Sequence, residues 1–213
     1  MPNLFVKICG ITSQEDAELA IESGANALGF IFHPDSPRYV EPHEIKKWIG
    51  TLPKSIRKVG VFVDHSFKQI DTIMEETQLD WIQYHCPITE QLPESYAGRY
   101  IHVRSIKNEE KMLQLNLKTK PVALLLDTQK GTQYGGTGES FNWQLIDTIQ
   151  TQVDIPIWIA GGLSIANIPT LLTQYRIDGI DLSSSLEKKP GKKDPQKCKR
   201  FSEWLADYRT IND

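Results

Sequence analysis

Cys9 is the first residue of the chain whose position suggests chemistry. It ends the first apolar run, Leu4–Ile8, and leads through Gly10 to Ser13, a predicted helix N-cap. A thiol at the end of a buried strand can act as a general base or nucleophile once its pKa falls below the free value of roughly 8.5. A lone cysteine is more often a small core residue. Its role therefore depends on what the other strand ends carry.

A carboxylate lies in the corresponding position of a later apolar run. Asp127 directly follows Val122–Leu126, which partly desolvates it and can raise its pKa toward the range of a proton donor. Cys9 and Asp127 then suit a reaction in which one group donates a proton and the other removes one. A loop cap is the alternative role for Asp127.

Two more strand ends suit a phosphate. Gly161 and Gly162 follow the run Pro156–Ala160, and Ser183 and Ser184 open a predicted short extra helix after the next run. Backbone N–H groups at a helix N-terminus bind phosphate well. A tight Gly-Gly turn is the alternative, but the serine run one strand later favours the phosphate.

Three further side chains are candidates for substrate contacts. Arg38 lies in a loop, where its guanidinium suits either a substrate carboxylate or a surface ion pair. His85 follows a predicted strand and is either a ligand contact or a structural histidine, and Asp181 lies near the end of the last predicted strand. No cluster of metal ligands is apparent, so we expect no metal site.

The elements that position these residues alternate regularly between apolar runs and amphipathic segments. The predicted strands are Leu4–Ile8, Ala27–Phe32, Val59–Val63, Asp80–Tyr84, Tyr100–Val103, Val122–Leu126, Pro156–Ala160 and Gly179–Leu182. The predicted helices lie near Asp16–Ile21, Pro42–Ile49, Phe67–Thr77, Glu109–Leu115, Trp143–Thr151, Ile165–Gln174 and Pro195–Asp207, with a weaker Pro-interrupted segment after the fourth strand. Eight such units favour an α/β fold, a closed (β/α)8 TIM barrel in one domain spanning 1–213, over an open doubly wound sheet.

Composition excludes several classes of partner. The formal net charge is -3 and no basic face is evident, so we expect no nucleic-acid partner. The one basic cluster is expected to be a solvated turn, with direct phosphate binding as the alternative, and consists of Lys188, Lys189, Lys192 and Lys193. No apolar run approaches the roughly 20 residues that span a bilayer, so we expect no membrane partner. Three widely spaced cysteines and the absence of a leader pattern predict a reduced, cytoplasmic protein. Nothing along the sequence demands a partner chain, so we expect a monomer, with a homodimer as the alternative.

At these residues the chain resembles the phosphoribosylanthranilate isomerase family along nearly its whole length. The matching segments are Lys7–Thr12, Gly29–Phe32, Ser36–Val40, Val59–Val63, Leu125–Asp127, Gly135–Gly138, Ala160–Leu163 and Pro190–Asp194. Each segment is short, but their order and spacing together are specific.

The resemblance implies an isomerase of tryptophan biosynthesis, acting at the third step from chorismate on a small phosphorylated substrate without a cofactor. It implies that Asp127 protonates the ribose ring oxygen of N-(5-phosphoribosyl)anthranilate and that Cys9 removes the C2 proton, an Amadori rearrangement. It further implies that Arg38 binds the anthranilate carboxylate, that His85 and Asp181 contact the substrate, and that the backbone at the two phosphate loops binds the phosphate.

Two residues depart from the family pattern, and other functions remain open. Cys86 and Ser185 stand where the family usually has glycine, and a Cβ at Ser185 would disfavour a positive φ. The related histidine-pathway isomerase typically has an aspartate at the position of Cys9 and needs two phosphate sites. A binding protein without turnover is the alternative from another class. Indole-glycerol phosphate synthase fits poorly because no strand end offers a lysine as its acid.

Overall fold

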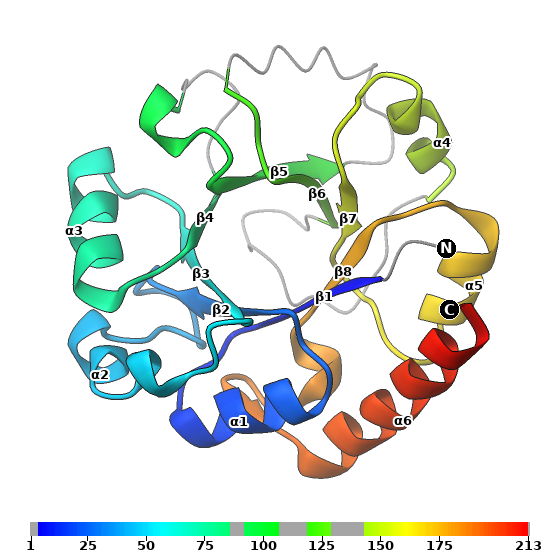
Figure 1. Ribbon diagram of the computed structural model, residues 1–213, viewed down its shortest axis with the longest axis horizontal. Helices are drawn as coiled ribbons and strands as arrows, with labels where there is room; N and C mark the ends of the chain where they lie inside the picture. Colours follow the sequence, from blue (N-terminus) through cyan, green and yellow to red (C-terminus); the bar gives the residue numbers. More distant parts are fainter. Residues whose placement is uncertain (1–3, 86–91, 107–118, 129–142, 213) are drawn as a thin grey trace.

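Eight parallel strands close into a barrel in chain order (Figure 1). The computed structural model describes residues 4–85, 92–106, 119–128 and 143–212. The strands are β1 (Phe5–Cys9), β2 (Ala27–Ile31), β3 (Arg57–Phe62), β4 (Trp81–Tyr84), β5 (Tyr100–Ile106), β6 (Ala123–Thr128), β7 (Ile157–Ile159) and β8 (Gly179–Leu182). β1 pairs with both β2 and β8, which closes the ring. The predicted closed barrel is therefore confirmed, and the open sheet is excluded.

Helices lie around the outside of this ring (Figure 1). They are α1 (Gln14–Glu22), α2 (Pro42–Lys46), α3 (Phe67–Thr77), α4 (Leu145–Gln150), α5 (Ile168–Gln174) and α6 (Pro195–Asn212), with short 3-10 turns η1 (Ile49–Thr51), η2 (Glu94–Tyr96) and η3 (Ser184–Leu186). Ser13 caps α1 as expected, since its hydroxyl accepts the N–H of Asp16 at 3.2 Å. None of the helices in the described ranges is long and apolar enough to cross a membrane.

Several boundaries differ from the sequence prediction. β6 continues to Thr128, because Ser105 and Asp127 pair in the β5–β6 ladder beyond the apolar run. The predicted helix Pro42–Ile49 stops at Lys46 and is followed by η1. After β4, where a weaker, Pro-interrupted helical segment was predicted, the described residues contain the short turn η2. Three predicted features lie outside the described residues: the helix Glu109–Leu115, the glycine-rich segment Gly135–Gly138 and the residue Cys86.

Alternation along each strand separates two apolar regions. Outward side chains such as Val6 and Ile8 pack in the cluster between strands and helices. Inward side chains form a second cluster, in which Phe5 stacks on Trp158 with ring centroids 4.5 Å apart and Trp81 lies beside them. These rings fill the N-terminal end of the barrel and leave its C-terminal end to polar side chains.

A small hairpin joins β8 to α6. Its strands are β9 (Glu187–Lys189) and β10 (Lys192–Lys193), and Pro190-Gly191 forms the two-residue turn. Gly191 has φ +75°, which suits glycine at the second central position of a turn with proline at the first. The expectation of a wholly solvated basic turn is wrong, because Lys193 is buried in this hairpin.

Candidate active site

Cys9 ends β1 at the C-terminal mouth of the barrel and is 7% exposed. The neighbouring strand makes room for its sulfur, since a Cβ on Gly29 would lie 2.6 Å from Sγ. Burial raises the pKa of the Cys9 thiol above its ordinary value, and the ammonium groups of Lys7 and Lys193 partly offset that rise. The net shift is upward, because burial and the carboxylate of Asp181 outweigh the two cations. The enclosed thiol therefore does not have the lowered pKa that the sequence-based expectation required of a general base.

Lys7 and Asp181 form a buried ion pair within the barrel. Their Nζ and Oδ2 atoms are 2.7 Å apart, and the Lys7 side chain has no exposed surface. Burial lowers the pKa of Lys7, but the charges of Asp181 and Cys9 outweigh it and raise that pKa above its ordinary value. Lys7 thus stays charged. The second carboxylate oxygen of Asp181, Oδ1, accepts no hydrogen bond from the described residues.

Asp127 lies within β6 and is 9% exposed. It occupies the same inward-facing register as Leu125 and Ala123, which belong to the barrel interior. Two strands, β7 and β8, separate β6 from β1 around the ring. Asp127 and Cys9 therefore enter the barrel mouth from different sides, as the acid–base prediction requires.

Arg38 follows β2 and is paired with Glu187. Its Nε lies 2.9 Å and 3.1 Å from the two Glu187 oxygens, and its Nη2 lies 2.7 Å from Oε2. The side chains are 11% and 3% exposed, respectively, so the alternative of a surface ion pair is wrong. Gly10, with φ +75°, lets Arg38 pass close to β1, because a Cβ there would lie 2.6 Å from the Arg38 Cδ.

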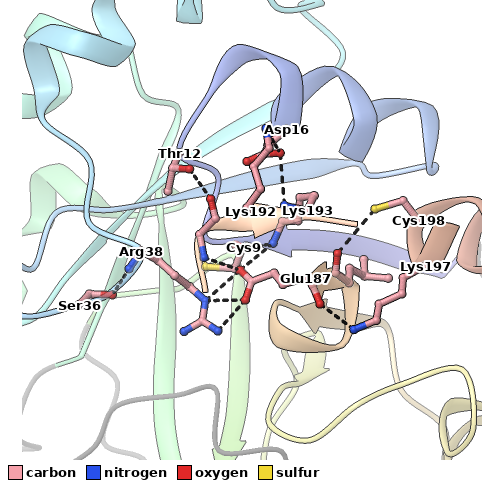
Figure 2. A network of polar contacts seen from close by, with 12 residues as sticks. Cys9, Thr12, Asp16, Ser36, Arg38, Glu187, Lys192, Lys193, Lys197 and Cys198 are labelled. Atoms are coloured by element: carbon pink, nitrogen blue, oxygen red, sulfur yellow. Dashed lines mark hydrogen bonds and ion pairs between the residues drawn. The ribbon is translucent and has the colours of Figure 1, made fainter. Parts of the chain in front are cut away.

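Figure 2 shows how this pair connects to Cys9. The Lys193 ammonium lies 3.3 Å from Glu187 Oε1 and donates a 2.7 Å hydrogen bond to the backbone carbonyl of Cys9. The Gly191 N–H also donates to Glu187, at 3.3 Å. The β9–β10 hairpin thereby links the loop after β2 to the end of β1.

His85 follows β4 directly and lies beside Gln83. The Gln83 Nε2 and His85 Nε2 atoms are 3.0 Å apart, an arrangement in which the amide donates to a neutral imidazole. Burial, followed by the charges of Lys7 and His33, lowers the pKa of His85 to about 4. The ring is therefore neutral near pH 7. Its predicted contact with substrate stays a prediction.

The predicted phosphate loops present free backbone donors. Gly161 and Gly162 have φ values of +80° and +64°, a conformation that favours glycine. Their N–H groups and those of Ser183 and Ser184 donate to no acceptor among the described residues. Asn167 braces the first loop by donating to the Gly162 carbonyl at 2.9 Å.

Ser185 does not adopt the strained conformation that its sequence position suggested. Among the described residues, Gln78 is the one non-glycine residue with a positive φ. Ser185 instead lines a cavity of about 270 Å³ next to the phosphate loops, and Ser164, Lys197 and Arg200 also line it. The replacement of glycine at Ser185 therefore places no strain on the loop.

The structure brings most of the predicted residues to one end of the barrel. Cys9, Arg38, Asp127, His85 and Asp181 belong to five strands or the segments that follow them, all at the C-terminal end. No described group of three or more His, Cys, Asp or Glu side chains is placed to hold a metal ion.

Sequence reasoning missed three charged residues that contact these groups. Lys7, Glu187 and Lys193 are buried ions with long-range partners. A lysine within an apolar strand was a detectable signal in the case of Lys7, because an isolated charge is rarely buried without a partner. Glu187 and Lys193 are separated from Arg38 and Cys9 by most of the chain, and no local pattern reveals such pairs.

Comparison with known proteins agrees with this geometry. The family described as N-(5'-phosphoribosyl)anthranilate (PRA) isomerase matches residues 6–203. An N-(5'-phosphoribosyl)anthranilate isomerase from Magnetococcus marinus is 40% identical over 197 residues, 92% of each chain. The crystal structure of phosphoribosyl anthranilate isomerase from Thermotoga maritima has a TM-score of 0.81 at 34% identity, covering 95% of this chain and 98% of that one.

A further structure of such an isomerase contains reduced 1-(o-carboxyphenylamino)-1-deoxyribulose 5-phosphate. It has a TM-score of 0.78 at 31% identity and covers 95% of this chain and 98% of that one. The match extends over nearly the whole chain in sequence and in structure. This chain belongs to the N-(5'-phosphoribosyl)anthranilate isomerase family.

Proposed function

We propose that this chain isomerises N-(5'-phosphoribosyl)anthranilate in tryptophan biosynthesis, with Cys9 as the general base and Asp127 as the general acid. The observation that supports the assignment most is the placement of both groups, nearly buried, on two separate strands at the barrel mouth, three positions apart around the ring. An aldose–ketose rearrangement needs one proton delivered and one removed, and two such groups suffice for both transfers.

The reaction proceeds in three steps. Asp127 protonates the ribose ring oxygen, the ring C–O bond breaks, and an iminium forms between C1 and the anthranilate nitrogen. The Cys9 thiolate then removes the C2 proton, and the electron pair of that C–H bond forms the C1–C2 double bond of an enolamine. Protonation at C1 and loss of the C2 hydroxyl proton give the ketone.

Substrate binding uses the remaining residues at the same end of the barrel. Arg38 binds the anthranilate carboxylate through donors that Glu187 does not occupy. The N–H groups of Gly161, Gly162, Ser183 and Ser184 bind the phosphate. Asp181 accepts from a ribose hydroxyl through Oδ1, and His85 contacts the substrate as a neutral ring.

The test measures the fluorescence decay of freshly generated N-(5'-phosphoribosyl)anthranilate with wild-type protein and with Cys9→Ala and Asp127→Asn. Each variant should lose turnover by roughly 100-fold or more, the size of a general acid or base contribution. Cys198→Ala is the matched control, because Cys198 is a fully buried thiol on α6. The control should keep full turnover.

Binding separates lost chemistry from lost binding. The reduced product, 1-(o-carboxyphenylamino)-1-deoxyribulose 5-phosphate, should bind Cys9→Ala about as tightly as it binds wild type. Wild-type turnover in Cys9→Ala would contradict the assignment of the base. Tight binding of the reduced product without turnover in wild type would instead favour a binding protein that has lost the chemistry.

We also propose a domain organisation, an oligomeric state and a cellular location for this chain. We place residues 1–213 in one barrel domain that acts as a monomer, with a homodimer as the alternative; a dimeric isomerase is known from Thermotoga maritima. Sedimentation equilibrium decides between these states. A cytoplasmic location follows from the need to keep the Cys9 thiol reduced.

A further inference from the structure

Glu187 occupies one edge of the Arg38 guanidinium. It accepts from Nε at 2.9 Å and from Nη2 at 2.7 Å, which fixes the plane of the guanidinium as well as its position. Glu187 is 4% exposed, and burial raises the pKa of its carboxyl less than Arg38 and Lys193 lower it, so the group stays ionised. The pair is enclosed and rigid in comparison with a surface ion pair.

The other edge of Arg38 remains open to a ligand. A guanidinium has five N–H donors, and Glu187 uses one on Nε and one on Nη2. Nη1 makes no hydrogen bond with the described residues. The Nη1–Nη2 edge can therefore accept a second carboxylate with two parallel hydrogen bonds, in the plane that Glu187 imposes.

Lys193 connects this arrangement to the candidate base. Its ammonium contacts Glu187 and donates to the backbone carbonyl of Cys9. One buried side chain therefore links the carboxylate that holds Arg38 to the residue that carries the thiol. Arg38 and Lys193 thus share the one carboxylate of Glu187.

We propose that Glu187 is a positioning residue that, with Lys193, sets the place of the substrate's aryl carboxylate relative to Cys9. The inference rests on the proposed function, because it takes Arg38 as the carboxylate-binding group and Cys9 as the base. It adds that the orientation of Arg38, rather than its charge alone, aligns the C2–H bond with the thiolate. Misplacement of about 1 Å can cost on the order of 100-fold in rate, so orientation has a measurable effect.

The experiment compares two substrates in three proteins. The substrates are N-(5'-phosphoribosyl)anthranilate and N-(5'-phosphoribosyl)aniline, which lacks the carboxylate and cannot engage Arg38. The proteins are wild type, Glu187→Gln and Glu187→Asp. Glu187→Gln removes the charge at nearly the same size, whereas Glu187→Asp keeps the charge and withdraws the carboxylate by one methylene.

The matched control is Glu15→Gln. Glu15 also bonds the hairpin, through Lys192 at 2.7 Å, but it is exposed and makes no contact with Arg38. It should leave kcat and KM for both substrates within about 2-fold of wild type, as expected for an exposed ion pair.

Both Glu187 variants should lower kcat for the anthranilate substrate by about 10-fold or more and leave kcat for the aniline substrate within about 3-fold. If Glu187→Gln fails to fold, as judged by circular dichroism, Glu187→Asp supplies the result. Equal loss of kcat on both substrates overturns the inference, since damage to the fold acts on both alike. A lower KM at unchanged kcat in Glu187→Gln also overturns it, because Glu187 then only competes with the substrate carboxylate.

The wild-type data separate this inference from the proposed function. If wild type turns over both substrates with equal kcat/KM, Arg38 does not recognise the carboxylate and both statements fail. Absence of turnover also overturns both. If wild type prefers the anthranilate substrate and the Glu187 variants keep that preference in kcat, only the positioning role of Glu187 is wrong.

Discussion

Lys7 and Cys9 lie two residues apart on β1, so both side chains face the interior of the barrel. The ammonium of Lys7 bonds Asp181 at 2.7 Å and also opposes, through its charge and a hydrogen bond, the rise that burial causes in the pKa of the Cys9 thiol. The ammonium of Lys7 therefore interacts with the thiol of the candidate base, whereas the ammonium of Lys193 donates to the backbone carbonyl of the same residue.

Replacing Lys7 should make the thiolate of Cys9 harder to form. In Lys7→Met the positive charge beside the thiol is gone, so the pKa of Cys9 should rise further. The measurement is the ultraviolet absorbance of the thiolate against pH, taken as the difference from Cys9→Ala. The alkaline shift should also move the rising limb of kcat/KM to higher pH.

The double variant Lys7→Met/Asp181→Asn is the control for this prediction. It removes both charges, so the pKa of the Cys9 thiol and the free energy of unfolding should both return part of the way to their wild-type values. Lys7→Met alone should lower the free energy of unfolding by about 3–5 kcal/mol, since it leaves a buried carboxylate unpaired. An unchanged thiol titration in Lys7→Met would show that Lys7 serves the barrel core alone.

Arg38→Met should mainly raise KM for the anthranilate substrate, by roughly 10- to 100-fold, because a charged hydrogen-bond pair to the substrate is lost. KM for N-(5'-phosphoribosyl)aniline should stay nearly constant. Steady-state kinetics on both substrates measure this split. Arg57→Met is the control, since Arg57 stacks on Trp81 at the start of β3, at the other end of the barrel. An unchanged KM in Arg38→Met would limit Arg38 to its ion pair with Glu187.

Stability should fall between pH 6.5 and pH 4 in part because of His85. Burial, together with the charges of Lys7 and His33, lowers its pKa in the folded protein to about 4 from 6.5. As the pH falls below 6.5, the unfolded chain binds the proton first, so unfolding is favoured until the folded protein also binds it near pH 4. The contribution of His85 to the free energy of unfolding is constant above pH 6.5. Within the window it decreases as the pH falls, with a slope that approaches roughly 1.4 kcal/mol per pH unit.

Urea unfolding at several pH values tests this linkage. His85→Gln should flatten the decline between pH 6.5 and pH 4, and His43→Gln, at an exposed position on α2, should not. His102 has its pKa lowered to about 4, chiefly by burial, so some of the decline should persist in His85→Gln. Identical pH profiles for wild type and His85→Gln would contradict the assignment.

The barrel was predictable because each strand carries a nearly continuous apolar run bounded by turn residues. Phe67–Thr77 and Gly179–Leu182 match the prediction at both ends, since a capping box begins the first and a glycine begins the second. The limits of β5 and β6 were not predictable, because the ladder between Ser105 and Asp127 depends on pairing with a partner strand.

The site residues at the ends of predicted strands could be found from the sequence. Those that belong to charge pairs between distant parts of the chain could not. Cys9 and Asp127 stand out because reactive side chains interrupt apolar runs. Glu187 is 149 residues from Arg38 and belongs to a lysine-rich segment that resembles a solvated turn. Its role depends on burial, which neither composition nor periodicity reveals.

Ser185→Gly should restore the residue usual in the family and have little effect on phosphate binding. Ser185 has no positive φ, so its Cβ imposes no backbone strain that glycine would relieve. Its side chain lines the cavity near Lys197, whereas the proposed phosphate donors are the N–H groups of Gly161, Gly162, Ser183 and Ser184. The dissociation constant of the reduced product, measured by calorimetry, should therefore change by less than about 3-fold, under 1 kcal/mol.

Gly162→Ala is the contrast, because a φ of +64° is strained for alanine, and the affinity of this variant for the reduced product should fall by more. A tenfold gain in affinity in Ser185→Gly would mean that the serine restricts the phosphate loop despite its relaxed backbone.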